Sequence, residues 1–241
     1  TLQRHSFPTR RSSDLGLSHF YVDSSQGACD TALVDALAQL LAVAPQLPIF
    51  HGNYRQPIAS PDPVLRLTAR AGILREIVAA SHLKAPLIVH GTSSLDLHGA
   101  IPTHELALAA FDHELFELED CARRLHVPLW LENLPANEAA VFNCLNDYEE
   151  ILARHPSVSV IFDVGHANID NDSPFEALRR FPGRIAALSL SDNDGKVDLH
   201  KPLGQGCVGF DKLLDVIDAT KWRGLYRSEE HTSELQSPRL S

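Results

Sequence analysis

Residues 158–166, VSVIFDVGH, carry the pattern that best indicates how this chain folds, because an apolar run ends in Asp163 and is followed by a glycine and His166. Four other apolar runs also lead into potential metal ligands, which are His51, His90, Glu132, and Asp198 together with His200. Between His51 and Asp163, each ligand in turn is separated from the next by roughly 30–40 residues, which is about the length of one strand-and-helix unit. Side chains at the carboxyl ends of parallel strands face the catalytic mouth of a β/α barrel. The pattern therefore predicts a ring of ligands at one rim of a barrel.

Predicted strands and helices alternate along the whole chain. The strands are near-continuous apolar runs, which is typical of a parallel sheet covered by helices. We expect six strands, at residues 17–23, 47–51, 85–90, 128–132, 158–163 and 184–190, with a further strand starting in 222–226. An open doubly wound sheet is the alternative, but no glycine-rich phosphate fingerprint follows the first strand. The predicted fold class is α/β, a (β/α)8 TIM barrel that lacks its first strand and most of its last strand.

Helices are predicted between these strands, six in all, and several have clear start signals. Asp62 before Pro63 is a typical helix start, as is Thr103. Asn146 with Glu149 has the form of a capping box and predicts a helix that runs to His155. The histidines outside the ligand ring lie on helices or loops, and we expect them to face solvent: His98, His104, His113, His126 and His155.

The two ends of the chain differ from the rest. Residues 1–15 (TLQRHSFPTRRSSDL) and 227–241 (RSEEHTSELQSPRLS) show no core periodicity, and both resemble conceptual translations of short-read sequencing adapters. Such segments are excluded from fold reasoning. The alternative is a pair of natural polar tails. We expect a partial TIM-barrel domain over residues 16–226, flanked by two non-native adapter-like tails.

Composition restricts the class of partner. The net charge is −10, with 31 acidic against 21 basic residues, and nucleic-acid binding normally depends on Lys and Arg that neutralise phosphates. Nucleic acid is therefore an unlikely partner, although a local basic groove is compatible with this charge. The four cysteines form no CxxC pair, which is typical of reduced thiols in a cytoplasmic protein. No stretch is apolar enough to span a membrane, and nothing in the sequence indicates an oligomeric state.

The ligand types themselves point to a metal. Imidazole mixed with carboxylate suits Zn²⁺ or Mn²⁺ better than Ca²⁺, and a carboxylate can move a proton beside a carbon whose neighbouring oxygen a metal polarises. Taken singly, His51 and His90 could be polar rim residues. Glu132 is different, because it ends an apolar strand and an unpaired buried carboxylate is costly. Gly204 and Gly206 are either turn glycines or a backbone cradle for phosphate.

Five stretches resemble the motifs of one family: HGNY (51–54), IVHG (88–91), LENL (131–134), FDVGHAN (162–168) and SDNDGKVDLHKPLGQG (191–206). They resemble the xylose isomerase-like TIM barrel superfamily over nearly all of residues 16–226. That superfamily contains sugar and sugar-phosphate isomerases and epimerases, and also the AP endonuclease family 2 enzymes of the endonuclease IV type. FDVGHAN and the D-x-H-x-P-L-G-x-G run are the most specific of these motifs, and HGNY alone is weak.

The resemblance implies roles for individual residues. The match to the trinuclear members implies three metal positions, held by His51, His90 and Glu132, by Asp163 with Glu132 bridging, and by His166, Asp198 and His200. In members with a single ion, Mn²⁺ or Mg²⁺ is common. Glu132 is then the catalytic candidate. Candidate substrate-binding residues are Asn133, Lys201, Gly204 and Gly206.

This sequence departs from the family pattern at two points. The histidine usual on the seventh strand is replaced by Ser189, and the glutamate usual on the eighth strand would lie beyond Tyr226. The leading hypothesis is a metal-dependent sugar or sugar-phosphate isomerase/epimerase, inactive as this fragment. One alternative is an endonuclease IV-like, metal-dependent phosphodiesterase. The other is a non-catalytic barrel that binds a polyol, which Ser189 would favour.

Overall fold

The computed structural model describes residues 17–21, 31–43, 47–93, 103–135, 140–169 and 174–228. Residues 1–15, Cys29 and His98 lie outside these ranges. Seven parallel strands form one sheet in the order β1 to β7, so each strand pairs with its neighbours along the chain. The strands are β1 (Leu17–Tyr21), β2 (Leu47–His51), β3 (Leu87–His90), β4 (Leu129–Glu132), β5 (Ser159–Asp163), β6 (Ile185–Leu190) and β7 (Leu225–Ser228).

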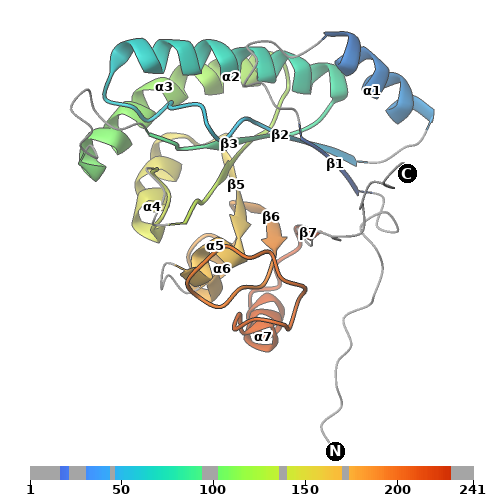
Figure 1. The fold of residues 1–241 in the computed structure, drawn as a ribbon, viewed down its shortest axis with the longest axis vertical. Coiled ribbons are helices and arrows are strands. Elements are labelled where there is room, and N and C mark those ends of the chain that lie inside the picture. Colours follow the sequence, from blue (N-terminus) through green and yellow to red (C-terminus); the bar gives the residue numbers. More distant parts are fainter. Residues whose placement is uncertain are drawn as a thin grey trace, which may run out of the picture.

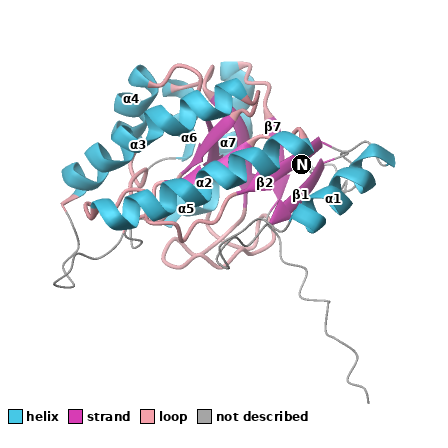
Figure 2. Cartoon of the chain, turned by 90° about the horizontal axis from the view of Figure 1, so that it is seen from above, coloured by secondary structure: helices cyan, strands magenta, loops and turns pink. Residues whose placement is uncertain are grey.

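Helices cover the outer face of this curled sheet (Figures 1 and 2). They are α1 (Thr31–Val43), α2 (Pro63–Leu83), α3 (His104–Arg124), α4 (Leu145–Arg154), α5 (Val164–Ile169), α6 (Pro174–Arg180) and α7 (Phe210–Thr220). A strand-then-helix order with neighbouring parallel strands is the barrel topology. Among the described strands β1 and β7 pair only on one side. The molecule is therefore an incomplete (β/α)8 barrel, as the sequence predicts.

The two faces of the sheet have separate apolar cores. The larger one lies between the strands and the helices and includes Phe50, Leu87, Phe111 and Leu131. The smaller one lies on the inner face and consists of Ile49, Ile88, Trp130, Ile161 and Ala187. The first four members stand two residues before the predicted ligands His51, His90, Glu132 and Asp163, and Ala187 stands two residues before Ser189. Because side chains alternate with a period of two, the apolar layer and the ligand layer share the inner face.

Several expectations need correction. The structure contains seven helices in its described part rather than six, because α5 begins directly after β5. The capping box at Asn146 and Glu149 is wrong, since α4 begins at Leu145 with Cys144 as the N-cap residue. The starts at Asp62 and Thr103 are confirmed by side-chain bonds to backbone N–H groups of the first turn.

The prediction of solvent-facing histidines is wrong at one position. His155 is fully buried, and its ring nitrogens lie 3.1 Å from Asp112 Oδ1 and 2.8 Å from Glu119 Oε2. The side chain is held there because two carboxylates compensate for the loss of water. His104, His113 and His126 are exposed, as expected. In the ranges that the structure describes, no helix combines the length and apolarity that crossing a membrane requires.

Candidate metal centre

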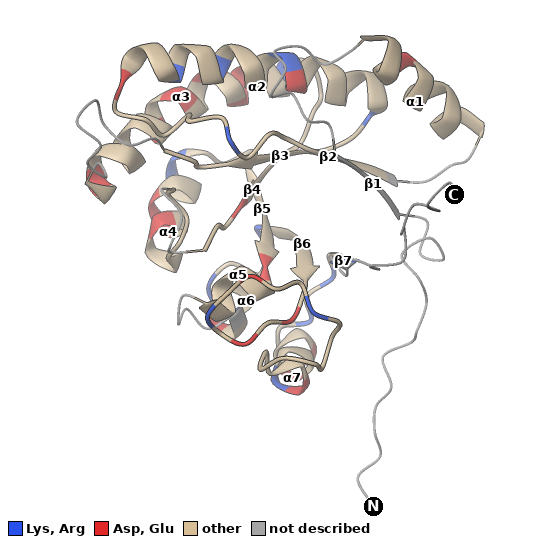
Figure 3. Ribbon diagram, viewed as in Figure 1, with Lys and Arg blue, Asp and Glu red and all other residues tan. Residues whose placement is uncertain are grey.

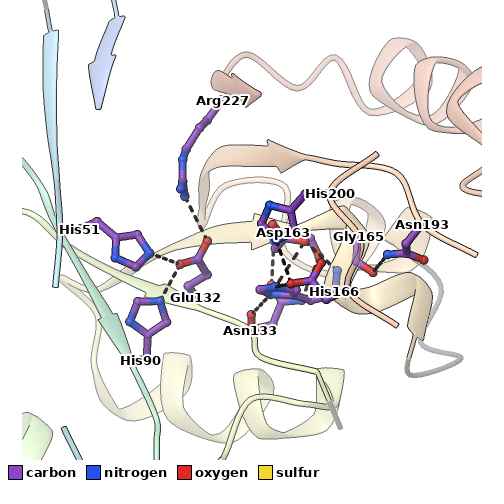
Figure 4. Close-up of polar contacts among 11 residues, drawn as sticks. His51, His90, Glu132, Asn133, Asp163, Gly165, His166, Asn193, His200 and Arg227 are labelled. Carbon is purple, nitrogen blue, oxygen red and sulfur yellow. Dashed lines mark hydrogen bonds and ion pairs between the residues drawn. The ribbon is translucent and has the colours of Figure 1, made fainter. Parts of the chain in front are cut away.

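Three of the predicted ligands converge at the ends of adjacent strands (Figure 4). His90 Nε2 lies 2.7 Å from Glu132 Oε2, and His51 Nε2 lies 3.4 Å from the same oxygen. His90 and Glu132 are direct partners in the register of β3 and β4, which places both side chains on the inner face at one level. All three residues are buried, with at most 9% of their surface exposed. We call this group the first cluster.

Burial and charge set the protonation of the first cluster. Burial alone would raise the pKa of Glu132, but hydrogen bonds from His51 and His90 lower it well below the ordinary value of 4.5, and the charge of Arg227 adds to this effect. Burial lowers the pKa of His90, against the raising effect of its hydrogen bond to Glu132. A carboxylate that is ionised and an imidazole that is neutral are the protonation states that a metal ligand needs.

A second cluster forms from the ligands that come later in the chain. Asp198 Oδ2 lies 2.8 Å from His200 Nε2 and 3.3 Å from His166 Nε2. Burial opposes the charge of Asp198, yet hydrogen bonds with these two rings lower the pKa of its carboxyl group strongly. The charges of Asp163 and Asp198 raise the pKa of His166 well above 6.5, although burial works the other way. His166, Asp198 and His200 therefore form the second cluster.

Asp163 lies beside the second cluster rather than in it. Its Oδ1 accepts a hydrogen bond of 2.6 Å from the backbone N–H of His166 and lies 3.8 Å from the Nδ1 of that ring. The side chain is fully buried at the end of β5. Its predicted role as a ligand that joins Glu132 to a second ion stays a prediction. Figure 4 shows Asp163 beside His166 and His200 of the second cluster.

The start of α5 positions His166. The His166 Nδ1 lies 2.7 Å from the backbone oxygen of Asn133, which fixes the ring and directs Nε2 toward Asp198. The side chain of Asn133 makes two further bonds to the backbone N–H and C=O of Asp163, at 2.7 and 2.9 Å. Gly165 has no space for a Cβ, because the hydroxyl of Ser191 would occupy it. This close approach explains the Asp-x-Gly-His spacing of the motif.

The Asn133 side chain therefore has a structural role. Its amide is buried and ties β4 to β5, so substrate binding by this side chain is not apparent from its contacts and stays a prediction. The same holds for Lys201, whose backbone forms a two-way bridge with Asp192.

The loop that carries Asp198 and His200 is organised by Asp192, a residue that the sequence analysis did not single out. Its carboxylate is fully buried and accepts four backbone N–H bonds of 2.9–3.1 Å, from Asn193, Gly204, Gly206 and Val208. The amides of Gly204 and Gly206 therefore already have an acceptor. This geometry favours the interpretation of both as turn glycines over a phosphate cradle. The sequence did contain a signal for this role, because Asp192 is followed in the same loop by Gly204 and Gly206, whose backbone N–H groups need a hydrogen-bond acceptor.

Ser189 occupies the position at which the family pattern has a metal-binding histidine. Ser189 is fully buried and pairs in register with Asp163 on one side and Arg227 on the other. Arg227 and Ser228 extend β7, although the sequence analysis grouped them with the tail. The Arg227 guanidinium reaches Glu132 Oε1 at 3.4 Å. A fixed cation thus stands beside the first cluster.

The residues present fit divalent ions. Each cluster offers three ligand atoms that lie within 4.8 Å of one another, and each mixes imidazole with carboxylate, the donor set of Zn²⁺ and Mn²⁺ sites. Asp198 adds a further observation. Its Oδ1 is buried and makes no hydrogen bond with any residue that the structure describes, an arrangement that is costly for a carboxylate unless a ligand satisfies it.

Comparison with known proteins gives an independent result. The model of the family described as xylose isomerase-like TIM barrel matches residues 15–240. An uncharacterized protein of Methanocaldococcus jannaschii is 26% identical over 121 residues, which are 49% of this chain and 47% of that protein. The chain thus spans about half the length of this curated relative.

Several solved structures with the same fold are named as sugar epimerases or as epimerase-like. A D-tagatose 3-epimerase-like protein has a TM-score of 0.76 at 19% identity, over 87% of this chain and 80% of that one. A D-allulose 3-epimerase from Methylomonas sp. has a TM-score of 0.74 at 18% identity, over 94% and 77%. An L-ribulose 3-epimerase has a TM-score of 0.73 at 17% identity, over 90% and 72%. At such identities the likeness shows the fold.

Proposed function

Because this chain belongs to the xylose isomerase-like TIM barrel family, we propose that it is a metal-dependent isomerase or epimerase of a sugar or sugar phosphate. The observation that carries the proposal is the first cluster, in which one buried carboxylate and two buried imidazoles meet at the strand ends. The fold shared with two sugar epimerases and with a protein named as epimerase-like supports the substrate class. Mn²⁺, Zn²⁺ and Mg²⁺ are the candidate ions.

Each residue has a part in this chemistry. A bound divalent ion would polarise a substrate oxygen and so acidify the adjacent C–H group. His51 and His90 hold the ion and orient Glu132 through its Oε2. The other oxygen, Oε1, lies 3.4 Å from the Arg227 guanidinium and would be the oxygen that accepts a proton from the reacting carbon and returns it. The inner apolar layer lies on the same face of the sheet and would limit the access of water to the reacting carbon.

Arg227 opposes this activity in the conformation described. Its guanidinium stands 3.4 Å from Glu132 Oε1, the oxygen that should exchange the proton, and its charge repels a divalent ion. We expect the chain to be inactive while this contact persists. Displacement of the guanidinium from Glu132 would be needed before turnover.

The test is a panel of ketoses, aldoses and their phosphates, incubated with the metal-free protein and with Mn²⁺, Zn²⁺ or Mg²⁺. Proton exchange at the reacting carbon is followed by NMR in D₂O, which detects even partial turnover because each abstracted proton is replaced by deuterium. Arg227→Ala should raise the exchange rate, and Glu132→Gln in the same background should abolish it while the fold persists. The lack of metal-dependent exchange with any sugar in the Arg227→Ala variant, when that variant binds stoichiometric metal, would refute the proposal.

The second cluster favours one alternative, an endonuclease IV-like phosphodiesterase. The resemblance to trinuclear members assigns a third ion to His166, Asp198 and His200, and these residues do lie together. Several ions in one site could activate water and stabilise a leaving oxygen. The charge pattern gives no support, since Lys and Arg are interspersed with Asp and Glu along α2, α3 and α7 (Figure 3). Cleavage of a duplex with an abasic site, abolished by chelator, would establish this alternative.

A further inference from the structure

A third group of ligand-type side chains lies apart from the two clusters. His104 at the start of α3 and Asp147 in the first turn of α4 approach to 2.7 Å between Nε2 and Oδ1. The Sγ of Cys144, the N-cap residue of α4, lies 3.3 Å from the same oxygen. All three ligand atoms fall within 4.8 Å of one another. None of these residues belongs to the candidate metal centre.

We propose that His104, Cys144 and Asp147 form a separate binding site for Zn²⁺ or a similar thiophilic divalent ion. Thiolate, imidazole and carboxylate together are a donor set of zinc sites, and three protein ligands leave a position for water. Asp147 is buried, whereas the side chain of His104 is 43% exposed. The group is therefore anchored from below and open to solvent on one side, through which an ion can enter.

The two carboxylate oxygens of Asp147 contact different groups. Oδ2 accepts a hydrogen bond of 3.0 Å from the backbone N–H of Phe142, which fixes the orientation of the carboxylate. Oδ1 faces both the thiol and the imidazole. If Asp147 served only to hold the backbone of Phe142, Oδ2 alone would be enough. An oriented carboxylate whose other oxygen meets two soft donors is the arrangement that fixes metal ligands in place.

The backbone before Cys144 supports the same inference. Phe142 has a φ of 68°, in the left-handed region that is costly for a residue with a bulky side chain. The conformation directs its N–H to Asp147 and its ring into the core against Phe111 and Tyr148. Strain of this kind is found where surrounding structure holds a functional geometry. Here it presents Cys144 and Asp147 on the same side of the helix start.

An ion at this place would join two loops beside the metal centre. The segments after β3 and β4 already touch, since Val141 N donates to the backbone oxygen of Gly91 at 2.8 Å and Thr92 bridges to Ala140. Coordination would add a cross-link from α3 to α4 over this contact. On binding, the S–H bond of Cys144 breaks, a metal–sulfur bond forms, and the proton leaves to solvent. The expected role is to stiffen the loops that follow His90 and Glu132.

Cobalt distinguishes this site from the metal centre. Neither cluster of the centre contains a cysteine, and within the described part of the chain the proposed site is the one such ligand group that does. A near-ultraviolet charge-transfer band of a thiolate bound to Co²⁺ therefore reports on the proposed site and not on the metal centre. Titration of the metal-free protein with Co²⁺ should produce this band, with an amplitude that corresponds to one thiolate-bound Co²⁺ per chain. Cys144→Ser should remove it, whereas Cys121→Ser, which changes a half-buried thiol elsewhere on α3, should leave it intact.

A second variant guards against a folding defect. His104 is exposed, so His104→Gln should leave the melting temperature of the metal-free protein unchanged, yet weaken the Co²⁺ affinity measured through the thiolate band about tenfold or more. Zn²⁺ should raise the melting temperature of the wild type by a margin that His104→Gln reduces. The absence of a thiolate band at saturating Co²⁺, or a band that survives Cys144→Ser, would overturn the proposal.

Discussion

Replacement of Asp192 by Asn should open the loop that carries Asp198 and His200. In the wild type each carboxylate oxygen accepts two backbone N–H groups, Oδ1 those of Asn193 and Val208, and Oδ2 those of Gly204 and Gly206. The substitution turns one oxygen into an NH₂ group, which then faces two donors. Hydrogen bonds to a charged group contribute about 1.5–3 kcal/mol each, so losing two of them costs about 3–6 kcal/mol.

Hydrogen exchange measures this cost locally. A loss of about 3 kcal/mol corresponds to roughly a hundredfold faster exchange of the loop amides if they exchange by local opening. The Zn²⁺ affinity of the second cluster should fall as well, because Asp198 and His200 lose their framework. The control is Asp194→Asn. Asp194 lies in the same loop and accepts N–H bonds from Lys196 and Val197, but its carboxylate is fully exposed, so the effect should be small.

The refuting result is specific. If the amides of Gly204, Gly206 and Val208 stay as protected in Asp192→Asn as in Asp194→Asn, the carboxylate does not hold the loop. Global unfolding by denaturant is measured in parallel, because protection that is lost everywhere at once would mean that the whole molecule had unfolded. A selective loss in 191–208 is the expected outcome.

Three further changes have defined outcomes. Arg227→Ala removes the cation beside Glu132 and should tighten metal binding at the first cluster by about tenfold or more, as measured by calorimetry; unchanged affinity would show that the guanidinium does not compete. Gly206→Ala places a Cβ against loop backbone and should cost about 1–3 kcal/mol, whereas Gly183→Ala, which has open space around it, should be nearly neutral in the same denaturation assay. Burial opposes the charge of Glu119, but its hydrogen bonds lower its pKa below 4.5. The ionised Glu119 therefore stabilises the fold above that pH, and this contribution is lost as the pH falls through the lowered pKa. In Glu119→Gln the free energy of unfolding should depend less on pH in the acid range, and an unchanged slope would contradict this.

The ligand ring was predictable because strands impose a period of two. In β2, β3 and β5 an isoleucine precedes the predicted ligand by two residues, at Ile49, Ile88 and Ile161, and alternation requires both members of each pair to face the same side. Strand ends in a parallel sheet meet at one edge. The predicted ligands, although far apart in the sequence, were therefore expected to meet at the edge of the sheet where the strands end. This reasoning needs no knowledge of the loops.

The contacts made by loops and by β7 could not be obtained in the same way. Arg227 meets Glu132 across 95 positions of the sequence, and that contact depends on how strongly the sheet curls, which no local pattern encodes. The sequence also does not show how deeply Asp192, Asp194 and Asp198 are buried, although it singles out Asp198 as a predicted ligand. Only the folded loop shows that the first is buried, the second exposed and the third directed toward His166.

The distribution of ligands over the strands makes metal binding separable from turnover. The first cluster uses the neighbouring strands β2, β3 and β4, and the second uses α5 and the loop after β6. Each cluster is held by short-range pairing and local hydrogen bonds, so neither needs β1 and β7 to meet. A substrate that contacts both clusters does depend on the curl of the whole sheet, because the curl sets how the two groups face each other. In the Arg227→Ala background, where the inhibiting contact is absent, destabilising β7 should therefore reduce proton exchange into the sugar, while each cluster still binds the metal proposed for it.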